Sequence, residues 1–402
     1  MHRRALLMTA AAAALSACAS QDQGARAHAA AASPHDFAAA LYRQLAAHAG
    51  NQFVSPYSVS AAFALVYPGA RGQTAAEIAG VLGYSSSSST ATAEARALAD
   101  ALQAQTGGST FTLANAAWVE RTLVLSPDYA RAVRDELGAT IEPVDFIANQ
   151  PAALARINAW AGEATRGRIP QVLTTPDESR RLVLTNAVHF LGRWSAPFSA
   201  RATRDGVFHA DGADTPARLM RQTTQARYFD NETLQAAEFD YDDGAFALAV
   251  LLPREVVGLA RFERDLSGDQ LGRWLQTLTE AAPQRLDVTL PKLEIRGDYE
   301  LSGPLQAMGM RAAFTNAADF SGITEAQALA ISAVVHKTFL KIDEDGAEAA
   351  AVTAIDMVAT AAPIRPPALP IEFKADRPFA IVLLHKPTGA ILFMGRIVTT
   401  AA

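Results

Sequence analysis

Residues 343–360 read DEDGAEAAAVTAIDMVAT, and this stretch decides the fold. Taken with a period of two, one set of side chains from Ala347 to Ala359 carries no charge and begins with three alanines. The alternating set from Glu348 to Val358 holds both charges of residues 347–360. Because successive side chains of a strand point to opposite faces, this segment could enter a sheet with its neutral face inward.

An exposed helix is the alternative interpretation of the same stretch. Alanine has the highest helix propensity, and Asp345 could cap such a helix. Prolines follow at positions 363, 366, 367 and 370. Proline lacks the backbone N–H that a central strand donates, so a strand built from this stretch has to end near residue 360. The flanking sequence has to separate the two interpretations.

The flanks contain an ordered set of motifs. They are FVSPYS (53–58), INAW (157–160), TRGRI (165–169), TNAVHFLGRW (185–194), LPKL (290–293), FSGI (320–323), SAVVHK (332–337), FKADRPF (373–379) and FMGRIV (393–398). In this order they resemble the serpin family of serine protease inhibitors. Residues 343–360 resemble the hinge and reactive-centre loop of that family. The resemblance covers roughly residues 34–400.

The resemblance implies an α+β fold, with helices packed on three mainly antiparallel sheets and an exposed reactive-centre loop at about residues 344–372. Local patterns predict helices over 37–49, 58–67 and 74–82, strands over 246–252 and 286–290, a hairpin of 379–384 with 390–394, and a serine-rich surface loop over 85–89. Helices dominate the first half and strands the last third, which is typical of an α+β fold.

The N-terminus predicts an export signal over residues 1–17. It has a basic start, an apolar stretch too short to span a bilayer, and Ala17 before Cys18. LSAC at 15–18 resembles a bacterial lipobox, which implies a lipid on Cys18 and anchoring at a membrane of the cell envelope, in the periplasm or at the cell surface. An ordinary signal peptide with an incidental cysteine is the alternative. We expect residues 18–33 to form a tether and residues 34–402 one serpin domain.

Composition limits the possible partners. Of 402 residues, 50% are hydrophobic and 19% are charged, which permits a large core and argues against disorder. The net charge is −6 and no run of five to eight Lys or Arg occurs, so we expect no nucleic acid partner. Cys18 is the only cysteine, so no intramolecular disulfide can form.

No catalytic motif is present in the sequence. It lacks a Gly-x-Ser-x-Gly elbow, a phosphate-binding loop and a His-Glu-x-x-His pair, and its eight histidines are scattered. We therefore expect no enzymatic activity, no cofactor and no metal. A periplasmic hydrolase whose serine site is assembled only in space is the alternative from another functional class.

The resemblance also assigns roles to five residues outside the loop. Ser55, Ser58, Asn186 and His336 match the polar shutter beneath the central sheet of the family, and Trp194 matches the breach, where the loop would first enter. A sheet that opens needs a hydrogen-bonded latch with two arrangements. The alternative is that these are ordinary buried polar groups with satisfied hydrogen bonds, and that Trp194 is only a large core side chain.

The mechanism that the resemblance implies is that of a suicide substrate. A serine protease forms an acyl-enzyme at the reactive bond, and the freed hinge inserts into the central sheet as a new strand. The residues that match the hinge are Glu344, Gly346, Ala347, Glu348, Ala349, Ala350, Ala351, Val352 and Thr353. Family spacing from Glu344 places the reactive bond between Thr360 and Ala361.

The residues around this bond predict the partner. Val358, Ala359 and Thr360 suit the shallow pockets of elastase-like or subtilisin-like proteases. Cleavage after Met357 would suit a chymotrypsin-like or elastase-like enzyme, and cleavage after Arg365 a trypsin-like one. We expect a monomer. Some serpins do not inhibit proteases, so a carrier or passive surface protein is the main alternative.

Overall fold

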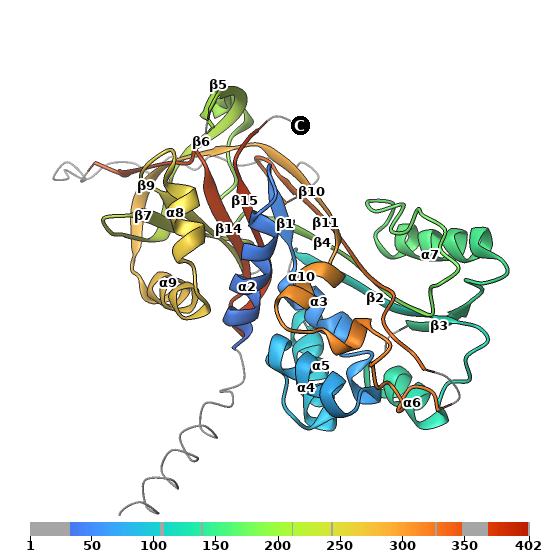
Figure 1. The fold of residues 1–402 in the computed structure, drawn as a ribbon. Helices are drawn as coiled ribbons and strands as arrows, with labels where there is room; N and C mark the ends of the chain where they lie inside the picture. The colour runs from blue at the N-terminus through green and yellow to red at the C-terminus, as the bar shows by residue number, and fades with distance from the viewer. Residues whose placement is uncertain are drawn as a thin grey trace, which may run out of the picture.

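The computed structural model describes residues 33–104, 108–137, 140–210, 212–242, 244–325, 328–347 and 369–400 (Figure 1). The signal peptide, Cys18 and nearly all of the tether lie outside the described residues. So do the predicted hinge residues Glu348, Ala349, Ala350, Ala351, Val352 and Thr353, and the predicted reactive bond Thr360–Ala361.

One sheet has six strands. Its order is β10 (Leu293–Glu300), β11 (Ala333–Ile342), β4 (Leu182–Arg193), β2 (Thr110–Glu120) and β3 (Thr140–Val144), and β12 (Gly346–Ala347) also pairs with β4. Alternate residues of β4 face different helices. Val183 belongs to the hydrophobic cluster that includes Ile157 of α7 (Gln150–Ala164), whereas Leu184 belongs to the cluster that includes Val59 of α3 (Pro56–Phe63). The two helices therefore cover opposite faces of this sheet (Figure 1).

The other sheet has nine strands. Its order is β1 (Gln52–Val54), β15 (Ala390–Ile397), β14 (Phe379–His385), β8 (Phe246–Pro253), β7 (Leu234–Asp240), β6 (Asp214–Asp230), β9 (Pro283–Pro291) and β13 (Ile371–Lys374), with β5 (Arg204–His209) beside β6. Three sheets were expected, but the described residues form two hydrogen-bonded sheets. The reason is that β6 is continuous, pairing with β9 over residues 219–227 and with β7 over residues 227–230.

The three predicted helices are present with shifted ends, as α2 (Pro34–Ala46), α3 and α4 (Gly72–Leu82). The further helices, besides α7, are α5 (Ser88–Gln103), α6 (Pro127–Arg131), α8 (Gly258–Asp265), α9 (Gly268–Glu280) and α10 (Ser302–Ala307), with the short helical turns η1 (Tyr67–Gly69), η2 (Ala132–Glu136), η3 (Ala200–Ala202) and η4 (Ala312–Phe314). The serine-rich loop ends earlier than predicted, because the Ser87 side chain accepts a hydrogen bond from the Thr90 amide and starts α5. None of the described helices is long and apolar enough to cross a membrane.

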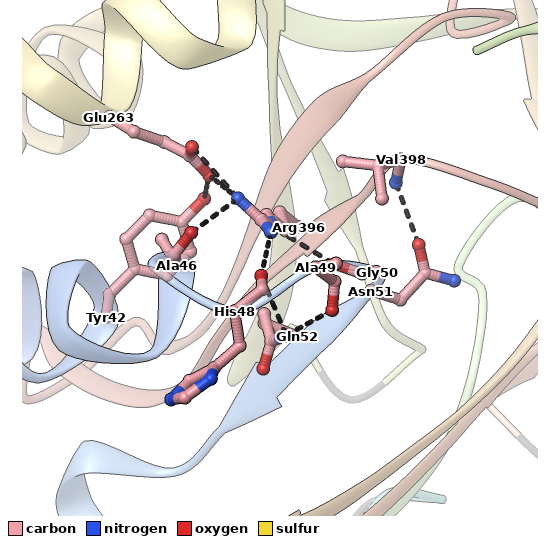
Figure 2. A network of polar contacts seen from close by, with 10 residues as sticks. All are labelled: Tyr42, Ala46, His48, Ala49, Gly50, Asn51, Gln52, Glu263, Arg396 and Val398. Carbon is pink, nitrogen blue, oxygen red and sulfur yellow. Dashed lines mark hydrogen bonds and ion pairs between the residues drawn. The ribbon is translucent and has the colours of Figure 1, made fainter. Parts of the chain in front are cut away.

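A buried arginine joins the end of β15 to the first described helix (Figure 2). Arg396 donates to both carboxylate oxygens of Glu263 at 3.0 Å, to the Ala46 carbonyl at 3.1 Å and to the Gly50 carbonyl at 3.0 Å. The Tyr42 hydroxyl donates to Glu263 at 2.7 Å. A buried ion pair is tolerated when its remaining donors and acceptors are satisfied. These bonds therefore fasten β15 to α2 and α8.

Candidate functional site

The central sheet is incompletely paired at one end. β11 and β4 are parallel partners from Ala333 opposite Val183 to Phe339 opposite His189, where their pairing stops. Beyond that point β12 pairs with β4 in the antiparallel sense, with Gly346 opposite Arg193 and Ala347 opposite Gly192. β12 also contacts β11. The first two residues of the hinge strand thus already lie between β4 and β11.

Packing explains the residue types of β12. Ala347 is fully buried in the core that the two sheets share. Gly346 has a φ of +144°, and a Cβ at this position would collide with the carbonyl oxygen of Gly192. Only glycine fits this close backbone approach without displacing β4. Ala347 at the next position is fully buried, so a larger or charged side chain there would have to displace its neighbours.

Trp194 holds the turn that precedes β12. Its indole Nε1–H donates to the Asp343 carbonyl at 2.9 Å, and its backbone N–H donates to the Asp345 carbonyl at 2.9 Å. The ring is 3% exposed and stacks on Tyr241 with centroids 4.7 Å apart. The residue predicted to mark the breach therefore contacts the hinge turn directly.

Glu344 provides a second attachment of the same turn. Its carboxylate accepts hydrogen bonds from Lys292 Nζ at 2.5 Å and Thr203 Oγ1 at 2.7 Å, and its carbonyl accepts from the Phe198 amide at 2.8 Å. Burial alone would raise the pKa of Glu344, but the hydrogen bonds from Lys292 and Thr203 outweigh burial and lower it. Glu344 is thus held ionised as an anchor of the hinge.

The predicted shutter residues lie together below the breach. The Ser55 amide donates to His336 Nε2 at 3.0 Å, so Nδ1 carries the proton and donates to Asn186 Oδ1 at 2.5 Å. Asn186 Nδ2 donates in turn to the Ser58 carbonyl at 2.9 Å. The Ser55 hydroxyl donates to the Leu392 carbonyl at 2.5 Å. The cluster therefore joins β4, β11, α3 and β15.

Two details of this cluster differ from the sequence interpretation. Asn115 of β2 also accepts a hydrogen bond from Asn186 Nδ2, and no motif had indicated it. The register of β2 against β4 places Asn115 directly opposite Asn186. In contrast, the Ser58 hydroxyl finds no hydrogen-bond partner among the described residues, so Ser58 contributes through its backbone.

Sequence comparison tests the family resemblance. The sequence model of the Serpin family, described as serine protease inhibitor, matches residues 32–400. The chain is a serpin. The family is one of protease inhibitors rather than enzymes. Within the described residues of this serpin, no group of three or more His, Cys, Asp or Glu side chains could hold a metal ion.

Relatives cover nearly the whole serpin. An uncharacterized serpin-like protein of Thermococcus kodakarensis is 38% identical over 361 residues, which is 89% of this chain and 82% of the relative. The leukocyte elastase inhibitor of Bos taurus is 34% identical over 382 residues, covering 90% of this chain and 97% of the relative.

Solved structures confirm the α+β serpin fold. Human thyroxine-binding globulin in complex with thyroxine matches with a TM-score of 0.83 at 26% identity, covering 92% of this chain and 98% of that chain. Uncleaved ovalbumin matches with a TM-score of 0.82 at 28% identity, covering 92% of this chain and 99% of that chain.

The breach geometry of the serpin makes a prediction for Trp194→Phe. The variant removes the indole donor to the Asp343 carbonyl, which then keeps only the longer bond of 3.3 Å from the Gly346 amide. Losing a hydrogen bond of this kind costs about 0.5–1.5 kcal/mol. We expect faster hydrogen–deuterium exchange over residues 343–347. Trp274→Phe on α9 is the matched control, since Trp274 stacks on Phe262 and not on the hinge turn. Equal exchange in the two variants would contradict the anchoring role of Trp194.

The buried histidines His336 and His189 predict a dependence of stability on pH. Burial lowers the pKa of His336 to about 3, and burial with the nearby Arg166 and Arg168 lowers the pKa of His189 to about 4. Between pH 6.5 and these values the unfolded chain binds protons that the folded chain excludes. The free energy of unfolding therefore falls as the pH drops below 6.5, by about 2 kcal/mol at pH 5 for His336 alone. Above pH 6.5 neither group contributes.

Urea unfolding from pH 5 to pH 8 measures this slope. His336→Gln keeps an acceptor for the Ser55 amide and a donor for Asn186 but cannot be protonated, so we expect a shallower slope. His48→Gln changes an exposed histidine and is expected to leave the slope unaltered. A His336→Gln slope equal to that of the native protein would contradict the neutral buried histidine.

Proposed function

We propose that this serpin traps serine proteases by inserting its cleaved reactive-centre loop between β4 and β11. The observation that carries the proposal is β12, where Gly346 and Ala347 already pair with β4 and Ala347 is buried. The new strand would thus extend an existing one, which avoids the cost of starting it.

The register of β12 predicts how far insertion can proceed. Continuing from Ala347 opposite Gly192, antiparallel pairing places Thr353 opposite Asn186 and Met357 opposite Leu182, the first residue of β4. The neutral set that begins at Ala347 would face the core throughout. Insertion ends before Pro363, so the proline-rich segment never has to enter the sheet.

The same register explains how the shutter residues Asn186 and His336 would respond to insertion. His336 lies directly opposite Asn186 in the parallel pairing of β11 with β4, and their side chains share a hydrogen bond. A strand that enters between β4 and β11 has to break this bond. Thr353 would then lie next to Asn186 and could supply a hydroxyl as the new partner. The cluster is therefore a latch with a closed and an open arrangement.

The proposed reactive bond is Thr360–Ala361, with an elastase-like or subtilisin-like protease as the partner. The small side chains Val358, Ala359 and Thr360 support this choice, as does the 34% identity to a leukocyte elastase inhibitor. Thr360 follows shortly after Met357, the last residue that β4 can pair. The acylated end would consequently emerge at the far end of the sheet.

Incubation with leukocyte elastase and with subtilisin tests the proposal. An inhibitor gives a covalent adduct that survives denaturing gel electrophoresis, and sequencing the released peptide identifies the bond. Elastase whose serine has been blocked is the control and should give no adduct. A clipped chain without adduct would favour a passive carrier, a possibility raised by the fold match to a serpin bound to thyroxine. Hydrolysis of added esters without clipping would favour the enzyme alternative.

We further propose that the chain is exported, cleaved before Cys18 and anchored by a lipid in a bacterial cell envelope, as a monomer. The support is the LSAC sequence at residues 15–18 after an apolar stretch. Cys18→Ser should move the protein from the membrane fraction to the soluble fraction. Sedimentation of the released variant measures its oligomeric state.

A further inference from the structure

A cavity of about 830 Å³ opens beside the first residues of α2. Figure 1 shows α2 between α9 on one side and α3 and α5 on the other, and residues of these helices and of the hairpin of β14 and β15 line the cavity. Ser33, Pro34 and Phe37 belong to the lining as well. The chain that precedes Ser33 therefore starts at the rim of this cavity.

The walls of the cavity are largely apolar. They carry the aliphatic side chains of Leu82, Leu98, Leu275 and Ile391, and the small side chains of Ala61, Ala91 and Ala95 leave the space open. A water molecule needs only about 10–15 Å³ of such volume, so a stretch of polypeptide fits. Because covering apolar surface is favourable, the cavity favours an occupant with small apolar side chains.

The start of α2 directs the preceding chain toward the cavity. Ser33 has an extended backbone, with φ −70° and ψ 159°, and closes a capping box with Asp36, so the helix begins at Pro34. An apolar residue directly before such a cap commonly packs against the fourth helical residue. Here those two residues are Ala32 and Phe37, and Phe37 is buried in the wall of the cavity.

Residues 25–32 of the tether read ARAHAAAA. Six of these eight side chains are alanine, and none is negatively charged. In an extended segment the alternating set that begins at Ala25 consists of alanine alone, and Arg26 lies on the opposite face. The segment can thus present a small apolar face together with one positive charge.

The rim of the cavity is acidic. Glu238 and Lys386 border the cavity and pair with each other at 3.4 Å. The other charged side chains of the lining are three exposed carboxylates and one exposed guanidinium, on Glu94, Asp269, Glu280 and Arg273. Their net charge of −2 is complementary to that of Arg26.

We propose that residues 25–32 dock into this cavity, with their alanines against Leu98 and Leu275 and with Arg26 at the acidic rim. Because the segment belongs to the same chain, its effective concentration at the cavity is on the order of 1 mM, so weak binding is sufficient. Docking leaves residues 18–24 as the free tether, which spans at most about 25 Å instead of about 50 Å for residues 18–32. The docking is independent of the proposed protease inhibition.

Alkylation of single thiols by iodoacetamide tests the docking in the full chain. Cys18→Ser removes the only native thiol, and Ala29→Cys or Ser20→Cys then places one thiol inside or outside the docked segment. Each rate is divided by the rate of the same variant in urea. We expect Ala29→Cys to react at least about tenfold more slowly than Ser20→Cys, as a segment docked about 90% of the time implies.

Two tryptophan variants of α5 locate the docked segment. Ala95→Trp fills the cavity and should bring the rate of Ala29→Cys close to that of Ser20→Cys. Ala97→Trp places the same ring on the exposed side of the helix and should leave the protection unchanged. Equal rates for Ala29→Cys and Ser20→Cys in the otherwise native chain would overturn the proposal, even if Ala95→Trp failed to fold. Protection that persists in folded Ala95→Trp, or that appears only at high protein concentration through the segment of a second molecule, would overturn it as well.

Discussion

Replacing Ala347 by arginine is expected to turn the proposed inhibitor into a substrate of the protease. Ala347 is fully buried where β12 enters the sheet, so a charged side chain there either remains in the core or expels β12. Burying an unpaired charge costs several kcal/mol. A barrier raised by only about 3 kcal/mol slows insertion more than about 100-fold. The acyl-enzyme then hydrolyses before the protease is trapped.

The measurement is the number of inhibitor molecules consumed per protease inactivated. We expect this stoichiometry to rise at least about tenfold for Ala347→Arg, since deacylation competes with an insertion step slowed by this barrier. Glu348→Arg is the matched control, because it places the same side chain one position along, on the opposite face of the strand. Inhibition should survive in Glu348→Arg. Unchanged stoichiometry in Ala347→Arg would exclude the insertion mechanism.

Cutting the loop near Thr360 is expected to raise the melting temperature. Residues 348–357 can continue β12 along β4 down to Leu182, and Ile355 and Met357 would then join the buried face. A net gain of about 5 kcal/mol is enough for a rise of roughly 10 °C or more, since 1 kcal/mol shifts a large domain by about 2 °C or more.

Thermal unfolding before and after limited proteolysis checks this expectation. The native protein should melt at a higher temperature once it has been nicked. Nicked Ala347→Arg is the control, because it has the same cut and a blocked entry to the sheet, and it should show little or no rise. An unaltered melting temperature in the nicked native protein would contradict both the insertion of the cleaved loop and the proposed inhibition.

Local sequence patterns predicted α2, α3, α4, β8, β9, β14 and β15, because each of these patterns depends on neighbouring residues. The apolar run that ends at Pro253 and the hairpin around Gly389 both appear as predicted. The prediction for the start of α5 was wrong. A serine tract is typical of a loop, but here Ser87 caps the helix, so α5 begins inside the tract. The merging of two expected sheets depends on the length of β6, which pairs with strands far away in sequence.

In the candidate site, too, the sequence indicated residues that belong to motifs but not residues placed by strand pairing. Ser55, Asn186 and His336 belong to recognisable motifs, and the structure brings them into one hydrogen-bonded cluster. Asn115 belongs to no such motif, and only the register of β2 against β4 places it in that cluster. The sequence did not indicate the partners of Glu344 either, because Thr203 and Lys292 lie 141 and 52 positions before it in the chain.

The position of β14 has a consequence for the fate of a captured protease. Cleavage after Thr360 would make the molecule two polypeptides, yet β14 is paired on both sides, with β8 and β15, and Arg396 fastens β15 to α2. The severed C-terminal piece should stay in place through non-covalent bonds alone. The captured enzyme would be joined covalently to the other piece, which carries Cys18. With a lipid on Cys18, spent complexes would accumulate at the cell envelope instead of diffusing away.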